Sequence, residues 1–486
     1  MRTRSLTSHA ARTDGAFVLY WMTSARRLRS NFALERAVAL AREHRTPLVI
    51  LEALRVGYPW ASDRLHRFVI DGMAEHARAL SATPVTYLPY VEPAAGDGKG
   101  LLATLAQHAV AVVTDDYPVF FLPRMLASAA RQVPVQFEAV DSNGLLPMRA
   151  AGRCFVTAFS LRAHIHNTLR QHIQMWPAEV SFDGLPALAA LPADVVTRWP
   201  ATTIETLESP ERLLASLPIN HSIDALPLRG GEAAAHAALA RFVTAAMGTY
   251  FVDRNQPSEH GTSRLSPYLH FGHISAHDIF TAVMNAEQWT TRKLAAKGGG
   301  KREGWWGVGP NAEAFLDQLI TWRELGFNMC VERPDDYDKY SSLPDWARAT
   351  LAAHANDTRP VIYTREQFER AETHDEVWNA AQRELTRTGW MHNYLRMLWG
   401  KKILEWSRSP EEALDHMTDL MNAYAFDGRD PNSYTGYFWT LGRYDRPWAP
   451  EREIFGMIRY MSSDSTMKKW RMKPYLKEFG VNPSLI

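Results

Sequence analysis

The first third of the chain alternates short apolar runs with amphipathic helical patterns, and strand signals stop after residue 210. Five runs are apolar enough for buried strands and are separated by segments with helical spacing. Such alternation is typical of a doubly wound parallel sheet, so we predict an α/β domain followed by an all-helical one. The predicted strands are 16–21, 47–54, 84–89, 109–116 and 133–140, and the predicted helices between them are 30–43, 62–80 and 101–108.

Prolines recur between residues 176 and 210, where charged residues are few. This composition is typical of a long linker that runs over the surface. We therefore predict an α/β domain at 1–175, a linker at 176–210 and a helical domain at 211–486. In the α/β domain, Asp115 and Asp116 end a predicted strand, so we expect them at a ligand-binding crevice at the carboxyl ends of the strands.

Composition excludes several classes of site. Cys154 and Cys330 are the only two cysteines among 486 residues, which leaves no disulfide framework and no four-cysteine iron–sulfur cluster. His270, His273 and His277 have helical spacing but no thiolate or paired carboxylate beside them, so we predict no metal site. The N-terminus is basic and polar, and no apolar run reaches membrane-spanning length. We expect a cytoplasmic protein with no membrane contact.

The formal net charge is only +1, so affinity for nucleic acid would have to come from a local patch. Between Arg452 and Lys477 the chain has seven basic and two acidic residues, with Tyr460 and Trp470 among them. A solvated helical face is one interpretation. The interleaved aromatic residues favour a surface that follows a nucleic-acid backbone and stacks bases.

Residues 389–406 read GWMHNYLRMLWGKKILEW and predict a helix after Gly389. Trp399 and Trp406 lie seven residues apart and therefore share one helical face. A helix that offers Arg396 and two indoles to its interior, followed by an acidic turn near Asp427, suits a planar, partly anionic redox cofactor. An aromatic core is the alternative.

A second cofactor signal precedes the helix that opens near Pro267. Thr262, Ser263, Arg264 and Ser266 supply hydroxyls and a guanidinium next to free amides at a helix start. These groups together favour a pyrophosphate site. The alternative is a simple helix cap, which would explain Ser266 and Pro267 but not the other three residues.

Several motifs resemble the photolyase/cryptochrome flavoprotein family, most closely the class II cyclobutane pyrimidine dimer photolyases. They are THDEVWNAAQ (373–382), GWMHNYLRM (389–397), WGKKILEW (399–406), DGRDPNSY (427–434) and GTSRLSPYLHFGHIS (261–275). Residues 20–37 are similar to the start of the class II antenna domain, so the resemblance covers nearly the whole chain.

The resemblance implies a deoxyribodipyrimidine photo-lyase with a Rossmann-like antenna domain and a helical FAD-binding domain. Such an enzyme repairs UV-damaged DNA by electron transfer from excited reduced FAD. It further implies an antenna chromophore, a deazaflavin or a folate, and we expect a monomer.

The resemblance places the family's functional positions on the following residues of this chain. The matched FAD contacts are Tyr250, Thr262, Ser263, Arg264, Leu265, Ser266, Arg396, Met421, Asn422 and Asp427. The matched lesion-pocket and electron-transfer residues are Gln318, Trp322, Asn393, Met397, Trp399, Trp378 and Trp406. The matched DNA contacts are Arg254, Asn255, Trp439, Trp448 and Arg459.

The chain departs from the class II pattern at three positions. Gln318 stands where class II enzymes usually carry Glu, and a glutamine side chain donates hydrogen bonds but supplies no proton. Met421 stands where an Asn usually faces the flavin N5 atom, with Asn422 adjacent. Leu398 replaces a Tyr beside the proximal indole. These departures leave two alternatives open: a cryptochrome-like blue-light photoreceptor, and a photolyase with another lesion preference, such as six-four photoproducts.

Overall fold

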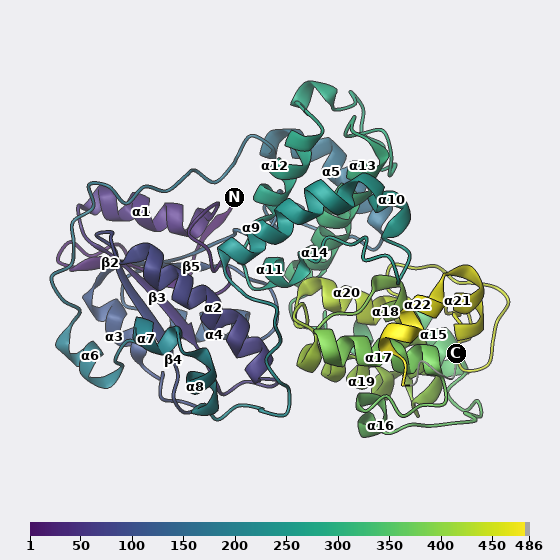
Figure 1. Ribbon diagram of the computed structural model, residues 1–486. Coiled ribbons are helices and arrows are strands. Elements are labelled where there is room, and N and C mark those ends of the chain that lie inside the picture. Colours follow the sequence, from purple (N-terminus) through teal and green to yellow (C-terminus); the bar gives the residue numbers. More distant parts are fainter. Residues whose placement is uncertain (482–486) are drawn as a thin grey trace. The chain divides into compact units, whose positions relative to one another are not determined.

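The computed structural model describes residues 1–481 and divides into two compact units. The first comprises Met1–Ala150, Leu169–Ala240 and Leu265–Ala282, and the second comprises Ala151–Thr168, Arg241–Arg264 and Val283–Ile486. Figure 1 follows the chain through them. The boundaries predicted at residues 175 and 210 remain a prediction about functional domains.

The first unit contains a six-stranded sheet in the order β1-β6-β5-β2-β3-β4. Strands β2 to β6 are parallel, and β1 pairs antiparallel with β6 at the edge. The strands are β1 Thr3–Ser5, β2 Phe17–Met22, β3 Leu48–Leu54, β4 Thr86–Val91, β5 Ala109–Asp115 and β6 Gln136–Val140. The doubly wound α/β prediction and its five strands are confirmed. The sequence did not predict β1, because three residues reading Thr-Arg-Ser carry no apolar signal.

Helices cover both faces of this sheet (Figure 1). Successive residues of β2 point to opposite faces, so Leu19 packs in the cluster that includes α3 and α4, and Tyr20 packs in the cluster that includes α1. The helices that lie largely in this unit are α1 Phe32–His44, α2 Asp63–Leu80, α3 Leu101–His108, α4 Leu122–Ala130, α6 Ala193–Arg198, α7 Ile204–Leu207, α8 Pro210–Ala215, α9 Glu232–Arg241, α11 Ser266–His270 and α12 Ala276–Ala286.

The proline-rich stretch at 176–210 forms part of the first unit's core. Val195 and Trp199 are buried in the same cluster as α3, and the Trp199 indole donates to the carbonyl of Asp97 at 2.7 Å. A few large apolar residues are enough to fix the segment against the sheet, although its overall composition is typical of a linker.

Asp115 and Asp116 serve the fold rather than an open crevice. Asp115 accepts hydrogen bonds from the Tyr20 hydroxyl and from the backbone amides of residues 23–25. Asp116 forms ion pairs with Arg4 and Arg149. Both carboxylates are buried, so their lone pairs stabilise the loops beside β5. The expectation that they face a ligand site is wrong.

The second unit is helical, and no strand follows Val140 among the described residues. Its helices are α5 Ala158–His172, α10 Tyr250–Asp253, α13 Pro310–Leu316, α14 Arg323–Glu332, α15 Asp345–Ala353, α16 Arg365–Glu369, α17 Glu376–Thr388, α18 Asn393–Trp406, α19 Pro410–Tyr424, α20 Pro431–Thr440, α21 Ser463–Lys469 and α22 Met472–Phe479. Shorter helical turns are η1 Phe242–Ala246, η2 Met247–Thr249, η3 Thr291–Lys293, η4 Asp317–Trp322 and η5 Tyr340–Ser342.

Local signals set the ends of the central helices. The Asp375 side chain caps α17, and Gly389 ends that helix in the left-handed conformation. Ser409 caps α19 and Asp430 caps α20, each with proline in the first turn. Helix α18 therefore begins shortly after the end of α17 and packs against α17, α19 and α20.

Gly400 lets α18 approach α19 and α20 closely. A Cβ at this position would lie 2.6 Å from Thr440 Cγ2 and 2.8 Å from Met417 Sδ. We expect Gly400→Ala to lower the free energy of unfolding by about 1–3 kcal/mol through overpacking. Gly436→Ala is the control, because no atom lies within 4 Å of a Cβ there, and it should stabilise helix α20 by about 0.5–1 kcal/mol. Thermal unfolding of both variants measures this, and equal effects would contradict the packing argument.

Within residues 1–481, none of the helices combines the length and apolar character that crossing a membrane requires. Among the same residues, no group of three His, Cys, Asp or Glu side chains is arranged to hold a metal ion.

Candidate active site

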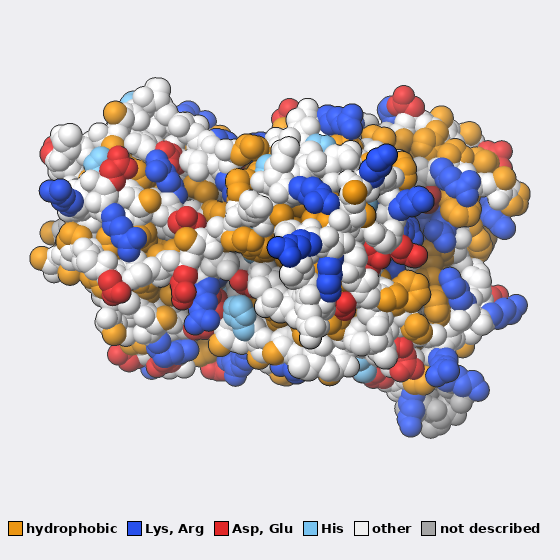
Figure 2. Space-filling view, turned by 90° about the horizontal axis from the view of Figure 1, so that it is seen from above, with side chains coloured by type: hydrophobic (Ala, Val, Ile, Leu, Met, Phe, Trp, Pro, Cys, Tyr) orange, Lys and Arg blue, Asp and Glu red, His pale blue; other side chains and the backbone are white. Residues whose placement is uncertain are grey.

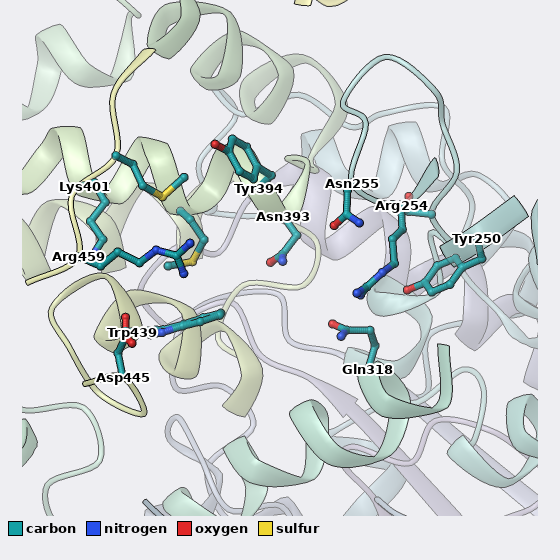
Figure 3. Close-up of a pocket in the computed structure, with 13 residues that line it drawn as sticks. Tyr250, Arg254, Asn255, Gln318, Asn393, Tyr394, Lys401, Trp439, Asp445 and Arg459 are labelled. Atoms are coloured by element: carbon teal, nitrogen blue, oxygen red, sulfur yellow. The ribbon is translucent and has the colours of Figure 1, made fainter. Parts of the chain in front are cut away.

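A cavity in the second unit gathers many of the polar and aromatic residues selected from the sequence (Figure 3). It contains about 820 Å³ of empty space, open solvent at its mouth included. Its lining residues are Tyr250, Arg254, Asn255, Thr262, Gln318, Asn393, Tyr394, Met397, Lys401, Trp439, Asp445, Arg459 and Met461.

Helix α18 supplies one wall of the cavity. Asn393, Met397 and Lys401 recur every fourth residue and therefore lie on one helical face, with Tyr394 beside them. Figure 3 shows Asn393 near the middle of the cavity and Lys401 at one end.

The opposite end is formed around α10 and the loop that follows it. Figure 3 shows Tyr250, Arg254 and Asn255 together there, with Gln318 between them and Trp439. Arg254 Nε and Thr262 Oγ1 are buried and have no hydrogen-bond partner among residues 1–481. Buried polar atoms without partners are costly, so these two groups suit a polar ligand.

Two indoles form the aromatic wall. Trp439, near the end of α20, stacks on Trp322 with ring centroids 5.2 Å apart and planes 19° apart. Trp439 lines the cavity and Trp322 supports it from η4. The stack presents a flat apolar surface of the kind that receives an unstacked base.

Arg459 lies at the same end of the cavity as Trp439 (Figure 3). Its guanidinium lies 4.9 Å from the centre of the Trp448 ring, and the Trp448 indole donates to Asp445 at 3.0 Å. Trp448 thus holds Arg459 and Asp445 together, although it does not line the cavity itself. Arg459 is exposed and has no carboxylate within 4 Å among the described residues, which leaves its charge available to an anion.

Arg396 and Asp427 form an ion pair of 2.7 Å between α18 and the turn before α20. Arg396 Nε also donates to the carbonyl of Met391 at 3.1 Å, and Asp427 raises the pKa of the guanidinium. Glu384 lies nearby, and burial raises the pKa of its carboxyl to about 7. The permanently charged guanidinium of Arg396 thus lies among the largely buried carboxyl groups of Asp427 and Glu384.

Arg264 lies over the Trp390 ring at 3.5 Å and has no ion-pair partner among residues 1–481. Burial lowers the pKa of its guanidinium, and the carboxylates of Glu384 and Glu478 offset this effect only in part. Thr262, Ser263 and Arg264 belong to the second unit, whereas Leu265 and Ser266 belong to the first. Ser266 begins the five-residue helix α11, with Pro267 in its first turn.

Met421 and Asn422 are both fully buried on α19. The Asn422 amide oxygen accepts from the backbone amide of Arg429 at 2.8 Å and from the Tyr437 hydroxyl at 3.1 Å. Its Nδ2 has no partner within residues 1–481. Asn422 therefore stabilises the turn that carries Asp427, and both N–H donors of its amide lack a partner among residues 1–481.

Trp399, Trp378 and Trp406 form a continuous series of indoles. Trp378 and Trp399 stack at 6.2 Å with planes 5° apart, and Trp378 and Trp406 lie 5.9 Å apart at 68°. All three are buried, and Tyr363 contacts Trp406 at 5.5 Å. Centroid separations of this size favour electron hopping between neighbouring rings.

Comparison with known proteins identifies relatives along almost the whole chain. A deoxyribodipyrimidine photo-lyase from Methanothermobacter thermautotrophicus is 32% identical over 98% of this chain and 97% of its own. The chain belongs to the photolyase/cryptochrome family. A rice enzyme of the same name is 33% identical over 95% of this chain and 87% of its own. No family model matches the chain.

Solved photolyases share the fold. A class III photolyase from Agrobacterium tumefaciens superposes with a TM-score of 0.63 at 18% identity, over 97% of this chain and 88% of that one. An archaeal photolyase from Sulfolobus tokodaii, solved with two FAD molecules, gives a TM-score of 0.63 at 15% identity, over 96% of this chain and 92% of that one. At these identities the likeness concerns the fold alone.

In this photolyase-family chain, four residues that line the cavity were not predicted from the sequence. They are Tyr394, Lys401, Asp445 and Met461. Lys401 had a usable signal, because it lies four residues after Met397 on the same helical face. Asp445 and Met461 lie in irregular segments, where no periodicity marks the side that faces the cavity.

Basic side chains also gather outside the cavity. Figure 2 shows Lys and Arg side chains interspersed with hydrophobic ones over the part of the surface formed by the C-terminal helical elements, at the right of that view. In this region, Lys469 lies 5.3 Å from the centre of the Tyr394 ring and 4.8 Å from that of Trp470. The interleaved charges and rings expected between residues 452 and 477 thus reach a residue of the cavity wall.

Proposed function

We propose that this protein repairs DNA in light by splitting cyclobutane pyrimidine dimers, as class II photolyases do, with FAD as its cofactor. The observation that carries the proposal is the cavity itself. It combines the stacked indoles Trp439 and Trp322 with arginines at both ends, Arg254 and Arg459. Aromatic and cationic groups together suit an unstacked dinucleotide with its phosphates.

The polar groups of the second unit fit FAD. Thr262 Oγ1 is buried without a partner, and Arg264 has no carboxylate within ion-pair distance among the described residues, which suits a pyrophosphate. Arg396, held by Asp427, would lie against the ring system, and Asn422 Nδ2 offers a further donor. When bound, FAD would supply the light-driven electron donor and acceptor of the reaction.

The protein's own groups have separable tasks in this proposal. Arg396 stabilises negative charge on the ring system, because its guanidinium stays protonated at every physiological pH. Trp439, supported by Trp322, receives the extrahelical bases and keeps water from one face. Gln318 donates a hydrogen bond to a lesion carbonyl and holds the dimer in place. Trp406, Trp378 and Trp399, in that order, conduct electrons toward the cofactor.

The proposal includes an antenna chromophore, a deazaflavin or a folate, in the α/β domain. In the Sulfolobus tokodaii photolyase, two bound FAD molecules imply a novel light-harvesting cofactor. A second chromophore would add its own absorption band to that of the flavin. An absorption spectrum of the purified protein therefore tests this part separately.

The lesion preference is tested in the dark. Dissociation constants are measured for three otherwise identical oligonucleotides that carry a cyclobutane dimer, a six-four photoproduct or no lesion. We expect the tightest binding for the dimer, because a damaged pair costs less to unstack than an intact one. Tighter binding of the six-four product would change the substrate. Equal binding of all three would favour the photoreceptor alternative, which Gln318 and Met421 suggest.

Two substitutions separate stacking from charge in this cavity. Trp439→Ala should weaken binding of dimer-containing DNA by about 1–3 kcal/mol through lost stacking, with the salt dependence unchanged. Arg459→Ala should weaken binding and also reduce the slope of log affinity against log salt, because one phosphate contact fewer releases fewer counterions. Titrations at several salt concentrations measure both effects, and identical slopes would contradict the role of Arg459.

Gln318→Glu restores the residue usual in class II enzymes. We expect repair by pre-reduced protein to stay equal or to rise, because a carboxyl group can both donate a hydrogen bond and stabilise the charged lesion. The quantum yield of dimer repair measures this. A large loss would indicate that the amide itself is required and would favour another lesion.

A further inference from the structure

Lys401 is a buried cation on the cavity face of α18. Its side chain is only 1% exposed, yet it has no carboxylate within ion-pair distance in the described part of the chain. Its Nζ donates to the carbonyl oxygen of Thr440, the last residue of α20. A buried ammonium with one protein partner leaves two N–H donors to be satisfied.

The charged groups around Lys401 only partly compensate its burial. Asp445 favours the ammonium form and Arg459 opposes it, both from the segment that follows α20. From α20 itself Lys401 meets the Thr440 carbonyl, and α19 approaches the neighbouring Gly400 through Met417. Burial lowers the pKa of Lys401 to about 7, so the amine is charged below that pH and neutral above it.

A purely structural role does not explain a lysine at this position. A buried lysine costs stability that a methionine of similar shape would not. Lys401 also lines the cavity at the end where Trp439 and Arg459 lie (Figure 3). The Thr440 carbonyl thus holds the ammonium beside the aromatic wall.

We propose that Lys401 is a substrate-binding residue of this cavity, whose ammonium donates hydrogen bonds to the carbonyl oxygens of an extrahelical pyrimidine pair while the Thr440 carbonyl orients it. The inference rests on the proposed function. Pyrimidine rings present carbonyl oxygens at their edges, and hydrogen bonds from a charged donor to such oxygens are stronger than those from a neutral one. A compact ammonium held at one N–H can direct its two remaining donors to neighbouring oxygens.

The test compares Lys401→Met, Lys401→Arg and the matched control Lys402→Met. Lys402 is the next residue of α18, is mostly buried and pairs with Glu405 at 2.7 Å, but does not line the cavity. The readout is the ratio of dissociation constants for intact and dimer-containing oligonucleotides, measured in the dark from about pH 6 to pH 9, on either side of the ammonium's titration. Taking the ratio cancels titrations that affect both DNAs equally.

Wild type and Lys402→Met should prefer the dimer about tenfold more at the acidic end of this range than at the basic end, the size of one charged hydrogen bond. Lys401→Arg should keep a high preference at every pH, because arginine stays charged. Lys401→Met should show a low preference at every pH.

Three outcomes are distinguishable. A wild-type preference that is equal at both ends of the pH range, or an unchanged profile in Lys401→Met, overturns the role of Lys401 and leaves the proposed function intact. Absence of any preference in wild type at every pH overturns the proposed function instead. If both Lys401 variants lose flavin or unfold, as thermal melting would show, the pH profile of wild type alone decides.

Discussion

Trp399→Phe is expected to abolish light-driven reduction of the bound flavin in the presence of an external reductant. Trp399 stacks on Trp378 at 6.2 Å, and Trp378 meets Trp406 at 5.9 Å. Phenylalanine is far harder to oxidise than tryptophan, so the substitution interrupts the series at its first member. Absorbance of the flavin under blue light measures the loss.

The control for this experiment is Trp289→Phe, an indole that contacts Trp306 in a separate cluster. In this variant the flavin should be photoreduced at the wild-type rate. Repair by chemically pre-reduced Trp399→Phe should also survive, because the indoles deliver electrons to the cofactor and do not touch the lesion. Flavin photoreduction at the wild-type rate in Trp399→Phe would show that electrons follow another route. The chain already departs from the class II pattern beside this indole, where Leu398 replaces a Tyr.

Arg396→Leu is expected to yield protein that purifies without flavin. The substitution removes the cation proposed to lie against the ring system and takes from the largely buried Asp427 carboxylate its ion pair with Arg396. Breaking a buried pair in this way typically costs about 3–5 kcal/mol of folding stability. Flavin content per protein and the unfolding midpoint measure the two effects.

The double variant Arg396→Leu/Asp427→Leu separates stability from binding. It also removes the carboxylate that has lost its arginine, so much of the folding stability should return while the flavin stays absent. Full flavin content in either variant would contradict the assignment of Arg396 to the cofactor site.

The fold is largely readable from the sequence where burial on both sides of the sheet imposes a simple pattern. β2, β3 and β5 are largely apolar because helices cover both faces of a parallel sheet. The edge strand β1 is not readable, because its pairing depends on β6, a partner far away in the sequence. The segment around Trp199 resembles a linker because average composition conceals a few apolar residues that are fixed by contacts distant in sequence.

The candidate site is readable only in part. Asn393 and Met397 are matched by motif, and both line the cavity. Lys401 could be predicted only by continuing the same helical face one turn beyond Met397. Asp115 shows the opposite error. It ends β5 at the expected edge of the sheet, but backbone amides of the loop after the neighbouring strand β2 occupy its carboxylate. Position in a fold indicates where ligands bind, whereas hydrogen-bond partners decide whether a side chain is available.

The most direct test is repair of a single-dimer oligonucleotide by the purified, pre-reduced protein under blue light, with a dark sample alongside. The account predicts that intact thymines are restored in the illuminated sample, over many turnovers per protein, and that the dark sample stays unrepaired. Unchanged dimer in both samples, from protein that carries reduced FAD and binds the oligonucleotide, would contradict the proposal that this photolyase-family chain is a dimer-splitting enzyme.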